Sequence, residues 1–192
     1  SRGLGDVYKR QSTYRFMEKV IRELIAMYEE AEVPLTTIHL GGDEVPEGAW
    51  MGSPVCRTFM DENGMTSAHE LSEYYITKMA DYLQQYHLQF SGWQEVALGH
   101  PEATDRHLNQ LAAGVYCWNT VPEWEADEIP YQIANKGYPV ILCNVNNFYL
   151  DLAYDAHPDE RGLSWAGYVD ESKGFSMLPY SIYRSSRTDM AG

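Results

Sequence analysis

The sequence predicts an α/β fold built around parallel strands. Short apolar, β-branched runs alternate along the 192 residues with segments of helical periodicity. The strand-like runs are apolar almost throughout, as in strands that are covered on both faces. Such alternation indicates a parallel sheet with right-handed crossovers, either a doubly wound sheet or a (β/α)8 barrel. Polar and aromatic residues follow the strands, which favours the barrel, because barrel enzymes build their sites at that end.

The first elements lead to a pair of carboxylates. Apolar residues at helical spacing predict an amphipathic helix over residues 12–30, with Ser12 or Thr13 as its N-cap. The β-branched run at residues 35–40 then predicts a buried strand that ends abruptly at Gly-Gly-Asp-Glu, residues 41–44. The strand therefore delivers two adjacent carboxylates at its carboxyl end.

The following elements repeat this pattern. A loop leads to Ser67 and Glu70, which have capping-box spacing and predict the start of a second helix. The later expected elements are a strand at 89–93, a helix at 106–113, a strand at 114–119, a helical turn at 131–136 and a strand at 139–144. Only about four strands are visible, whereas a complete barrel has eight over roughly 250 residues. We therefore expect a piece of a barrel.

Charge and composition exclude several classes of protein. Twenty-eight acidic and fourteen basic residues give a formal net charge of −14, which repels a phosphate backbone, so no nucleic-acid partner is expected. No apolar run approaches the roughly 20 residues of a membrane-spanning helix. Cys56, Cys117 and Cys143 lie at no metal-ligand spacing. We expect Cys117 and Cys143 to be small hydrophobic residues of buried strands.

The run His39-Leu-Gly-Gly-Asp43-Glu44 resembles the signature that ends the fourth barrel strand of family 20 β-N-acetylhexosaminidases. Three further segments are similar to that family and occur in its order: 91–95, which contains Gly-Trp, 149–151, which reads Tyr-Leu-Asp, and 162–170. The resemblance runs from Ser12 to about Arg184. It implies a partial (β/α)8 TIM barrel, roughly strands 4 to 7 with their helices, spanning residues 12–192.

The resemblance implies a retaining exo-hydrolase that removes terminal β-linked N-acetylglucosamine or N-acetylgalactosamine from a glycan or small glycoside. In that family the 2-acetamido oxygen of the substrate is the nucleophile, which makes an oxazolinium intermediate and needs no cofactor or metal. Glu44 would be the general acid/base, Asp43 would hold the acetamido group, and Tyr149 would orient its oxygen.

The remaining implied residues bind the sugar. Trp93 and Trp118 would form walls of the pocket, Asp151 would bind sugar hydroxyls, Trp165 would lie at the rim, and His39 opens the motif. Adjacent side chains of a regular strand point to opposite faces, so Gly41 and Gly42 must bend the backbone for both carboxylates to reach one substrate.

Several alternatives remain open from the residues alone. An isolated Asp-Glu pair after a strand is more often a helix start or a solvated turn. His39 by itself is expected to be a hydrogen-bonded strand residue, and Trp124 to be surface or loop packing. A non-catalytic N-acetyl sugar-binding relative is a second hypothesis. A metal-dependent barrel hydrolase using His39, Asp43 and His69 is a third.

The chain ends and the cellular location give further expectations. Residues 1–11 resemble the translation of a transposon end used in sequencing libraries, so we expect this segment to be non-native. The first three strands and the eighth strand of the family are absent, and a lone piece of a barrel exposes unpaired strand edges. We therefore expect low stability and little activity from these residues alone. Family members are commonly exported, which favours a periplasmic or extracellular location.

Overall fold

The computed structural model describes residues 11–46 and 48–181, so most of the expected non-native segment, residues 1–10, lies outside the described residues. Two compact units, residues 1–113 and 114–192, make up the chain, and their boundary falls within a strand. The elements of unit 1 are α1 (Gln11–Glu30), β1 (Thr37–His39), α2 (Gly48–Met51), α3 (Pro54–Glu62), α4 (Ala68–Gln84), β2 (Gln89–Trp93), η2 (Gln94–Ala97) and α5 (Glu102–Leu111). Those that follow are β3 (Ala112–Cys117), η3 (Pro122–Trp124), α6 (Ile129–Asn135), β4 (Val140–Leu142), α7 (Val145–Phe148) and α8 (Glu171–Phe175).

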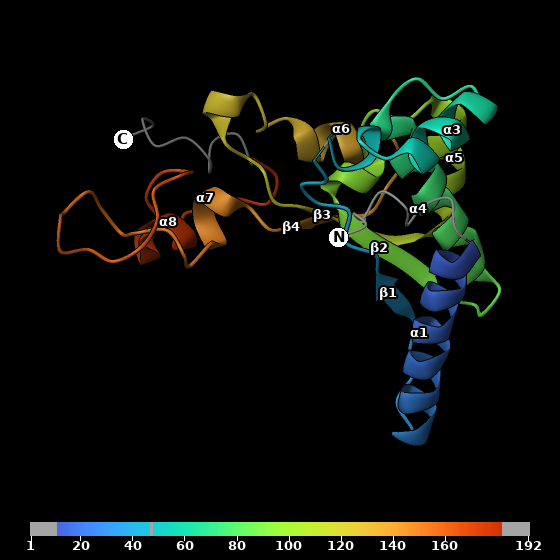
Figure 1. The fold of residues 1–192 in the computed structure, drawn as a ribbon. Helices are drawn as coiled ribbons and strands as arrows, with labels where there is room; N and C mark the ends of the chain where they lie inside the picture. Colours follow the sequence, from blue (N-terminus) through green and yellow to red (C-terminus); the bar gives the residue numbers. More distant parts are fainter. Residues whose placement is uncertain (1–10, 47, 182–192) are drawn as a thin grey trace. The chain divides into compact units, whose positions relative to one another are not determined.

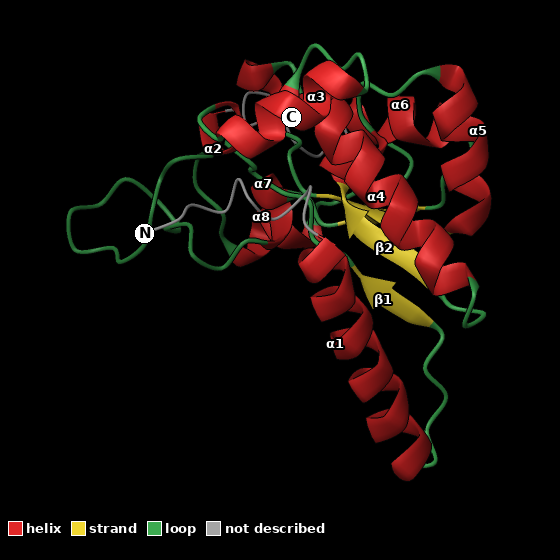
Figure 2. Cartoon of the chain, turned by 45° about the vertical axis from the view of Figure 1, so that its right-hand side comes forward, coloured by secondary structure: helices red, strands yellow, loops and turns green. Residues whose placement is uncertain are grey.

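The strands pair in parallel, as the alternation of helices and strands predicts. In unit 1, β1 lies beside β2 with Thr37 opposite Gln89 (Figure 2). In unit 2, β3 lies beside β4 with Val115 opposite Val140. Parallel strands end at the same edge, so the residues that follow β1 and β2 are brought together, as are those that follow β3 and β4.

Helix α4 begins where the capping-box spacing predicts. The Ser67 hydroxyl accepts from the Glu70 backbone N–H, and the Glu70 carboxylate accepts from the Ser67 backbone N–H. The helix buries Leu71, Met79 and Leu83 and packs against β2 and α5 (Figure 2). This packing holds β2 in place beneath the helix layer.

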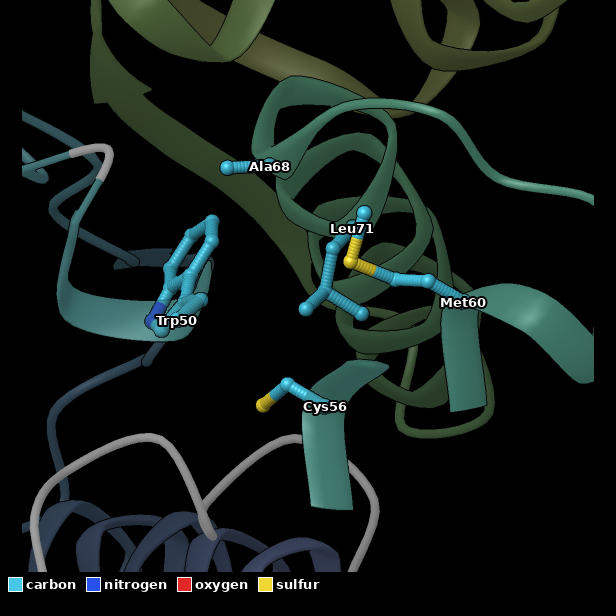
Figure 3. Close-up of a cluster of buried hydrophobic side chains, with 5 residues drawn as sticks. All are labelled: Trp50, Cys56, Met60, Ala68 and Leu71. Atoms are coloured by element: carbon cyan, nitrogen blue, oxygen red, sulfur yellow. The ribbon is translucent and has the colours of Figure 1, made fainter. Parts of the chain in front are cut away.

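The segment expected as a loop between the first strand and α4 instead contains two helices. Ser53 caps α3, where its side chain accepts from the Cys56 N–H and Pro54 occupies the first turn. Together with α2 and the start of α4, this helix forms a buried cluster of Trp50, Cys56, Met60, Ala68 and Leu71 (Figure 3). The prediction missed these helices because both are short, so neither repeats its apolar spacing often enough to show a period.

Other boundaries also differ from expectation. Helix α1 begins at Gln11, so Ser12 and Thr13 lie inside it and neither is its N-cap. Helix α5 begins four residues earlier than expected, and β3 takes in Ala112 and Ala113. Cys56 and Cys117 are buried, whereas Cys143 is half-buried and lies just past the end of β4, not inside a buried strand as expected.

Unit 2 contains two short helices that the sequence did not predict. Helix α7 separates β4 from Tyr149, so that residue does not directly follow a strand. Helix α8 packs against α7 (Figure 1). Among the described residues, no helix has both the length and the apolar character of a membrane span.

Candidate active site

The two candidate carboxylates lie on a sharp turn directly after β1. Pairing with the β2 segment continues past the strand, because the Leu40 N–H donates to Ser91 O at 2.8 Å and the Trp93 N–H donates to Gly41 O at 2.9 Å. The backbone then turns through Gly41 and Gly42, whose φ angles are 75° and 101°. This is the bend that the adjacent carboxylates require, and glycine adopts such angles without steric cost.

Glu44 itself has a φ of 47°, which places it in the left-handed region that a residue with a Cβ rarely adopts. Asp43 and Glu44 are both exposed. Non-glycine residues in this region concentrate at functional sites, where the surrounding structure holds the strained conformation. The turn therefore presents both carboxylates to solvent from a fixed backbone.

Close packing beneath the turn leaves room only for glycine. A Cβ on Gly42 would lie 2.5 Å from Val96 Cγ1, and a Cβ on Gly92 would lie 2.6 Å from the same atom and 3.1 Å from Gly41 O. Val96 belongs to η2 and is fully buried. Sequence reasoning did not identify Val96, because its role depends on two glycines that come close only through strand pairing.

His39 connects the turn to Trp93. Its Nδ1 accepts from the Gly41 N–H at 3.1 Å, and its ring meets the Trp93 ring edge-on, with centroids 5.4 Å apart. Desolvation lowers the pKa of the imidazole, and the Asp43 carboxylate acts in the opposite direction. The hydrogen bond confirms the expectation that His39 is a bonded strand residue, and a neutral ring is the form that can accept at Nδ1.

A pocket of about 300 Å³ opens beside the turn. Its lining comes from the turn, α2, α4 and η2: Gly42, Val45, Trp50, Ser67, Ala68, His69, Ser72 and Glu95. Trp50 joins this pocket to the buried cluster of Figure 3, which anchors the chain that follows the carboxylates. His69 lies against the His100 ring at 5.4 Å. Within residues 11–46 and 48–181, no three His, Cys, Asp or Glu side chains are grouped so as to hold a metal ion.

The candidate residues of unit 2 gather around Trp165. Its Nε1–H donates to the Asp151 carboxylate at 2.9 Å. The Tyr149 and Trp118 rings meet it edge-on at 6.0 and 6.4 Å, and the Trp124 ring stacks on it at 6.1 Å with an interplanar angle of 19°. Residues from three separate segments thus form one aromatic and acidic cluster, of which sequence reasoning had left out Trp124.

Backbone pairing holds Asp151 beside Trp165. The Leu163 N–H donates to Asp151 O at 2.7 Å, and the Ala153 N–H donates to Leu163 O at 2.8 Å. Gly162 has a φ of 145°, and a Cβ there would lie 2.6 Å from the Ala153 nitrogen. The glycine therefore permits two stretches of backbone to approach closely.

Hydrogen bonds of buried asparagines hold the same segments together. The Thr120 hydroxyl donates to Asn146 Oδ1 at 3.0 Å, and Asn146 Nδ2 donates to Ala166 O at 3.2 Å. Asn147 Nδ2 donates to Lys173 O at 2.9 Å, at helix α8. Asn146 thus connects the segment after Trp118 with the segment after Trp165. The sequence did not predict these asparagines, because the hydrogen bonds of a buried polar side chain can be identified only when its partners are known.

Comparison with known proteins shows which family this chain belongs to. A model of the glycosyl hydrolase family 20 catalytic domain matches residues 7–191. The chain belongs to glycosyl hydrolase family 20. The β-hexosaminidase of Vibrio vulnificus is 32% identical over 175 residues, which are 90% of this chain and 20% of that protein. The β-hexosaminidase of Vibrio furnissii is 30% identical over 167 residues, which are 87% of this chain and 24% of that protein.

The solved structures agree with this family 20 assignment. The Vibrio harveyi family 20 exo-β-N-acetylglucosaminidase, crystallised in complex with N-acetylglucosamine, is 26% identical with a TM-score of 0.69. The match covers 91% of this chain and 26% of that one. The chain therefore spans about a fifth to a quarter of the length of these relatives.

Proposed function

We propose that the protein carrying this chain is a retaining exo-β-N-acetylhexosaminidase that hydrolyses terminal β-linked N-acetylglucosamine or N-acetylgalactosamine. Membership of family 20 and similarity to the β-hexosaminidases of Vibrio support the reaction class. The substrate class is supported by the bound N-acetylglucosamine in the related Vibrio harveyi structure.

One observation carries the assignment to these residues. Asp43 and Glu44 are adjacent, exposed and held on a turn whose glycines and left-handed Glu44 backbone leave the regular strand path. A solvated surface turn of the ordinary kind does not need glycines packed against a buried Val96. Two carboxylates in fixed positions are what hydrolysis of a glycosidic bond uses.

The two carboxylates have different roles in the proposed reaction. The acetamido oxygen of the substrate attacks the anomeric carbon while Glu44 gives its proton to the leaving oxygen, which produces an oxazolinium ion and an alcohol. Asp43 holds the acetamido N–H and stabilises the positive charge that develops. Glu44 then takes a proton from water as the water oxygen attacks the anomeric carbon, and the sugar leaves with its configuration retained.

Tyr149 and the aromatic residues complete the proposed site. The Tyr149 hydroxyl donates to the acetamido oxygen and orients it for attack. Trp93 and Trp118 form walls of the sugar pocket, with His39 supporting Trp93 by its edge-on contact. In unit 2, Asp151 accepts from sugar hydroxyls while its other bond, from Trp165 Nε1, keeps the carboxylate in place.

We also propose that the two parallel strand pairs belong to a partial (β/α)8 barrel, roughly strands 4 to 7. The α/β similarity to family 20 structures supports this. Helix α1 adds a physical argument, because Phe16, Val20 and Met27 lie on one of its faces and are all exposed. An apolar stripe of this kind is normally covered by further elements of the same domain.

The test is hydrolysis by the full-length protein of an aryl N-acetyl-β-glucosaminide beside the matching aryl β-glucoside. We expect release of the aryl group from the first substrate only, because only that sugar carries the acetamido nucleophile. Cleavage of both substrates would contradict the substrate-assisted mechanism. Binding of N-acetylglucosamine without cleavage of either would indicate a sugar-binding relative.

A further inference from the structure

Asn146 is bonded to both of the segments that carry Trp118 and Trp165. It belongs to helix α7 and is 3% exposed. One end of its side-chain amide accepts from the Thr120 hydroxyl at 3.0 Å, and the other end donates to Ala166 O at 3.2 Å. Thr120 lies two residues after Trp118, and Ala166 directly follows Trp165. A single buried amide therefore links the two tryptophan segments.

Apolar packing holds these segments in contact but does not fix their separation. Val121, Val145 and Ala166 belong to one buried cluster of unit 2, and Tyr149 packs against it. Apolar contacts are non-directional, so such a cluster tolerates small shifts of one segment against another. A hydrogen bond weakens when its length or angle changes. The two hydrogen bonds of the Asn146 amide thus set a separation that packing alone does not set.

Helix α7 gives the Asn146 amide a fixed base. The Val145 N–H donates to Trp118 O at 2.9 Å, and the Tyr149 N–H donates to Val145 O at 3.4 Å. The side chain therefore starts from backbone that is bonded to the Trp118 segment and ends on the Trp165 segment. The Trp118 and Trp165 rings meet edge-on with centroids 6.4 Å apart. A change in the separation of the two segments changes this ring contact.

We propose that Asn146 is a positioning residue that sets the separation of Trp118 and Trp165, and through it the affinity for the terminal N-acetylhexosamine. This inference rests on the proposed function, in which both rings border the sugar site. Asn146 is buried, so it acts through the two rings and not by contact with the sugar. Loss of either of its hydrogen bonds lets the segments shift and weakens sugar binding.

The first test is Asn146→Asp in the full-length protein, with the dissociation constant of N-acetylglucosamine measured by titration calorimetry across a range of pH. The two side chains have nearly the same shape. An ionised carboxylate has no proton to donate to Ala166 O, so we expect the constant to rise by about three- to tenfold at the highest pH, as for one lost hydrogen bond. A protonated carboxyl donates to Ala166 O and accepts from Thr120, and burial raises the pKa of such a group. The affinity is therefore expected to return as the pH falls.

The constant of the variant is divided by that of the unaltered protein at each pH. Ionisable groups of the neighbouring segments are present in both proteins, so their own titration cancels in this ratio: Cys143, Tyr149, Asp151, Asp170 and Lys173. The matched control is Asn144→Asp, because Asn144 is also fully buried but donates to Asn147 Oδ1 at 3.3 Å, inside its own segment. We expect this control to lower the free energy of unfolding in urea and to give a ratio near one at every pH.

Thr120→Val and Thr120→Ser test the other hydrogen bond of the amide. Valine keeps the shape of threonine but has no hydroxyl to donate, so we expect a rise of about three- to tenfold that does not depend on pH. Serine keeps the hydroxyl and is expected to restore most of the affinity. This pair decides the role of Asn146 if Asn146→Asp does not fold.

Three outcomes separate this proposal from the proposed function. If Asn146→Asp and Thr120→Val lower the free energy of unfolding but leave the dissociation constant unchanged at every pH, Asn146 only supports the fold and the proposal is wrong. If the unaltered protein binds N-acetylglucosamine but does not cleave the aryl N-acetyl-β-glucosaminide, the proposed hydrolysis fails, and the dissociation constants still decide the role of Asn146. Absence of binding by the unaltered protein would contradict both proposals.

Discussion

Glu44 illustrates how a single residue can carry both a chemical and a conformational role. Its left-handed backbone, together with Gly41 and Gly42, turns the chain away from the strand direction. A regular strand would send the Asp43 and Glu44 side chains to opposite faces. Because of this backbone conformation, the two carboxylates need not point to opposite faces. The buried Val96 side chain packs against Gly42 and supports the turn.

Replacement of Glu44 by Gln tests its role as general acid. We expect kcat/KM for substrates with poor leaving groups to fall by about 10²–10⁴, because they require protonation in the transition state. Activated aryl glycosides are expected to lose much less. The matched control is Glu32→Gln, since Glu32 is also exposed and left-handed, with a φ of 55°, but lies before β1. Equal losses on both classes of substrate would contradict the assignment of Glu44 as the general acid.

His39 gives a pH prediction at the same scale. Desolvation lowers the pKa of the folded imidazole below the ordinary value of 6.5, so the unfolded chain binds the proton more readily. The stabilisation is therefore present above pH 6.5 and is lost as the pH falls through the lower pKa of the folded state. His39→Asn keeps an acceptor for the Gly41 N–H but does not titrate. We expect the free energy of unfolding of this variant, measured in urea, to fall less steeply below pH 6.5, and identical slopes would contradict the prediction.

At the scale of elements, local patterns predicted the longer helices and the strands. The capping box at Ser67 and Glu70 and the β-branched run before Gly41 are local signals, and both elements lie where these signals place them. The helices α2, α3, α7 and α8 have four to nine residues each and were missed. Helices of that length are stabilised by tertiary packing more than by their own sequence, as the cluster around Trp50 shows.

The pairing of residues 151–153 with Leu163 allows a test of an element that only the structure revealed. Gly162→Ala would combine a φ of 145° with contacts of 2.6 and 2.8 Å to the Ala153 backbone. Overpacking against backbone atoms costs about 1–3 kcal/mol in addition to the conformational strain. We expect a loss of stability in urea and a higher KM for sugar substrates, because Asp151 and Trp165 move apart.

Gly167→Ala is the control for this variant. Gly167 also has a positive φ, 98°, but a Cβ there would meet no atom within 4 Å. It therefore measures the conformational cost without the collision. If the two variants lose the same stability, the close approach at Ala153 does not hold the two segments together.

At the scale of the whole molecule, several large apolar side chains are exposed, and the chain matches only part of the length of its relatives. Phe16 and Met27 on α1 are 65% and 63% exposed, and Leu150 and Tyr180 in unit 2 are 94% and 95% exposed. Large exposed apolar surface is normally a contact surface. The relatives are four to five times as long as the matched segment, so their further residues are available to cover such faces.

A prediction for the whole molecule follows from these exposed faces. We expect the 192 residues produced alone to show a lower urea midpoint than the full-length protein and no hydrolysis of an aryl N-acetyl-β-glucosaminide. The comparison uses equal molar concentrations and the same buffer. Full activity of the isolated chain would mean that the proposed residues of units 1 and 2 suffice without any further part of the barrel.

The sequence by itself determined the family, the reaction class that we propose and most of the longer elements. These follow from short, contiguous signals such as His39-Leu-Gly-Gly-Asp43-Glu44, which require no knowledge of distant contacts. The tertiary structure alone decided that Val96 supports Gly42 and Gly92, that Asn146 connects Thr120 to Ala166, and that Trp124 stacks on Trp165. Each of these contacts joins residues from separate segments, and such pairs are set by strand pairing and loop packing, which no local period in the sequence encodes.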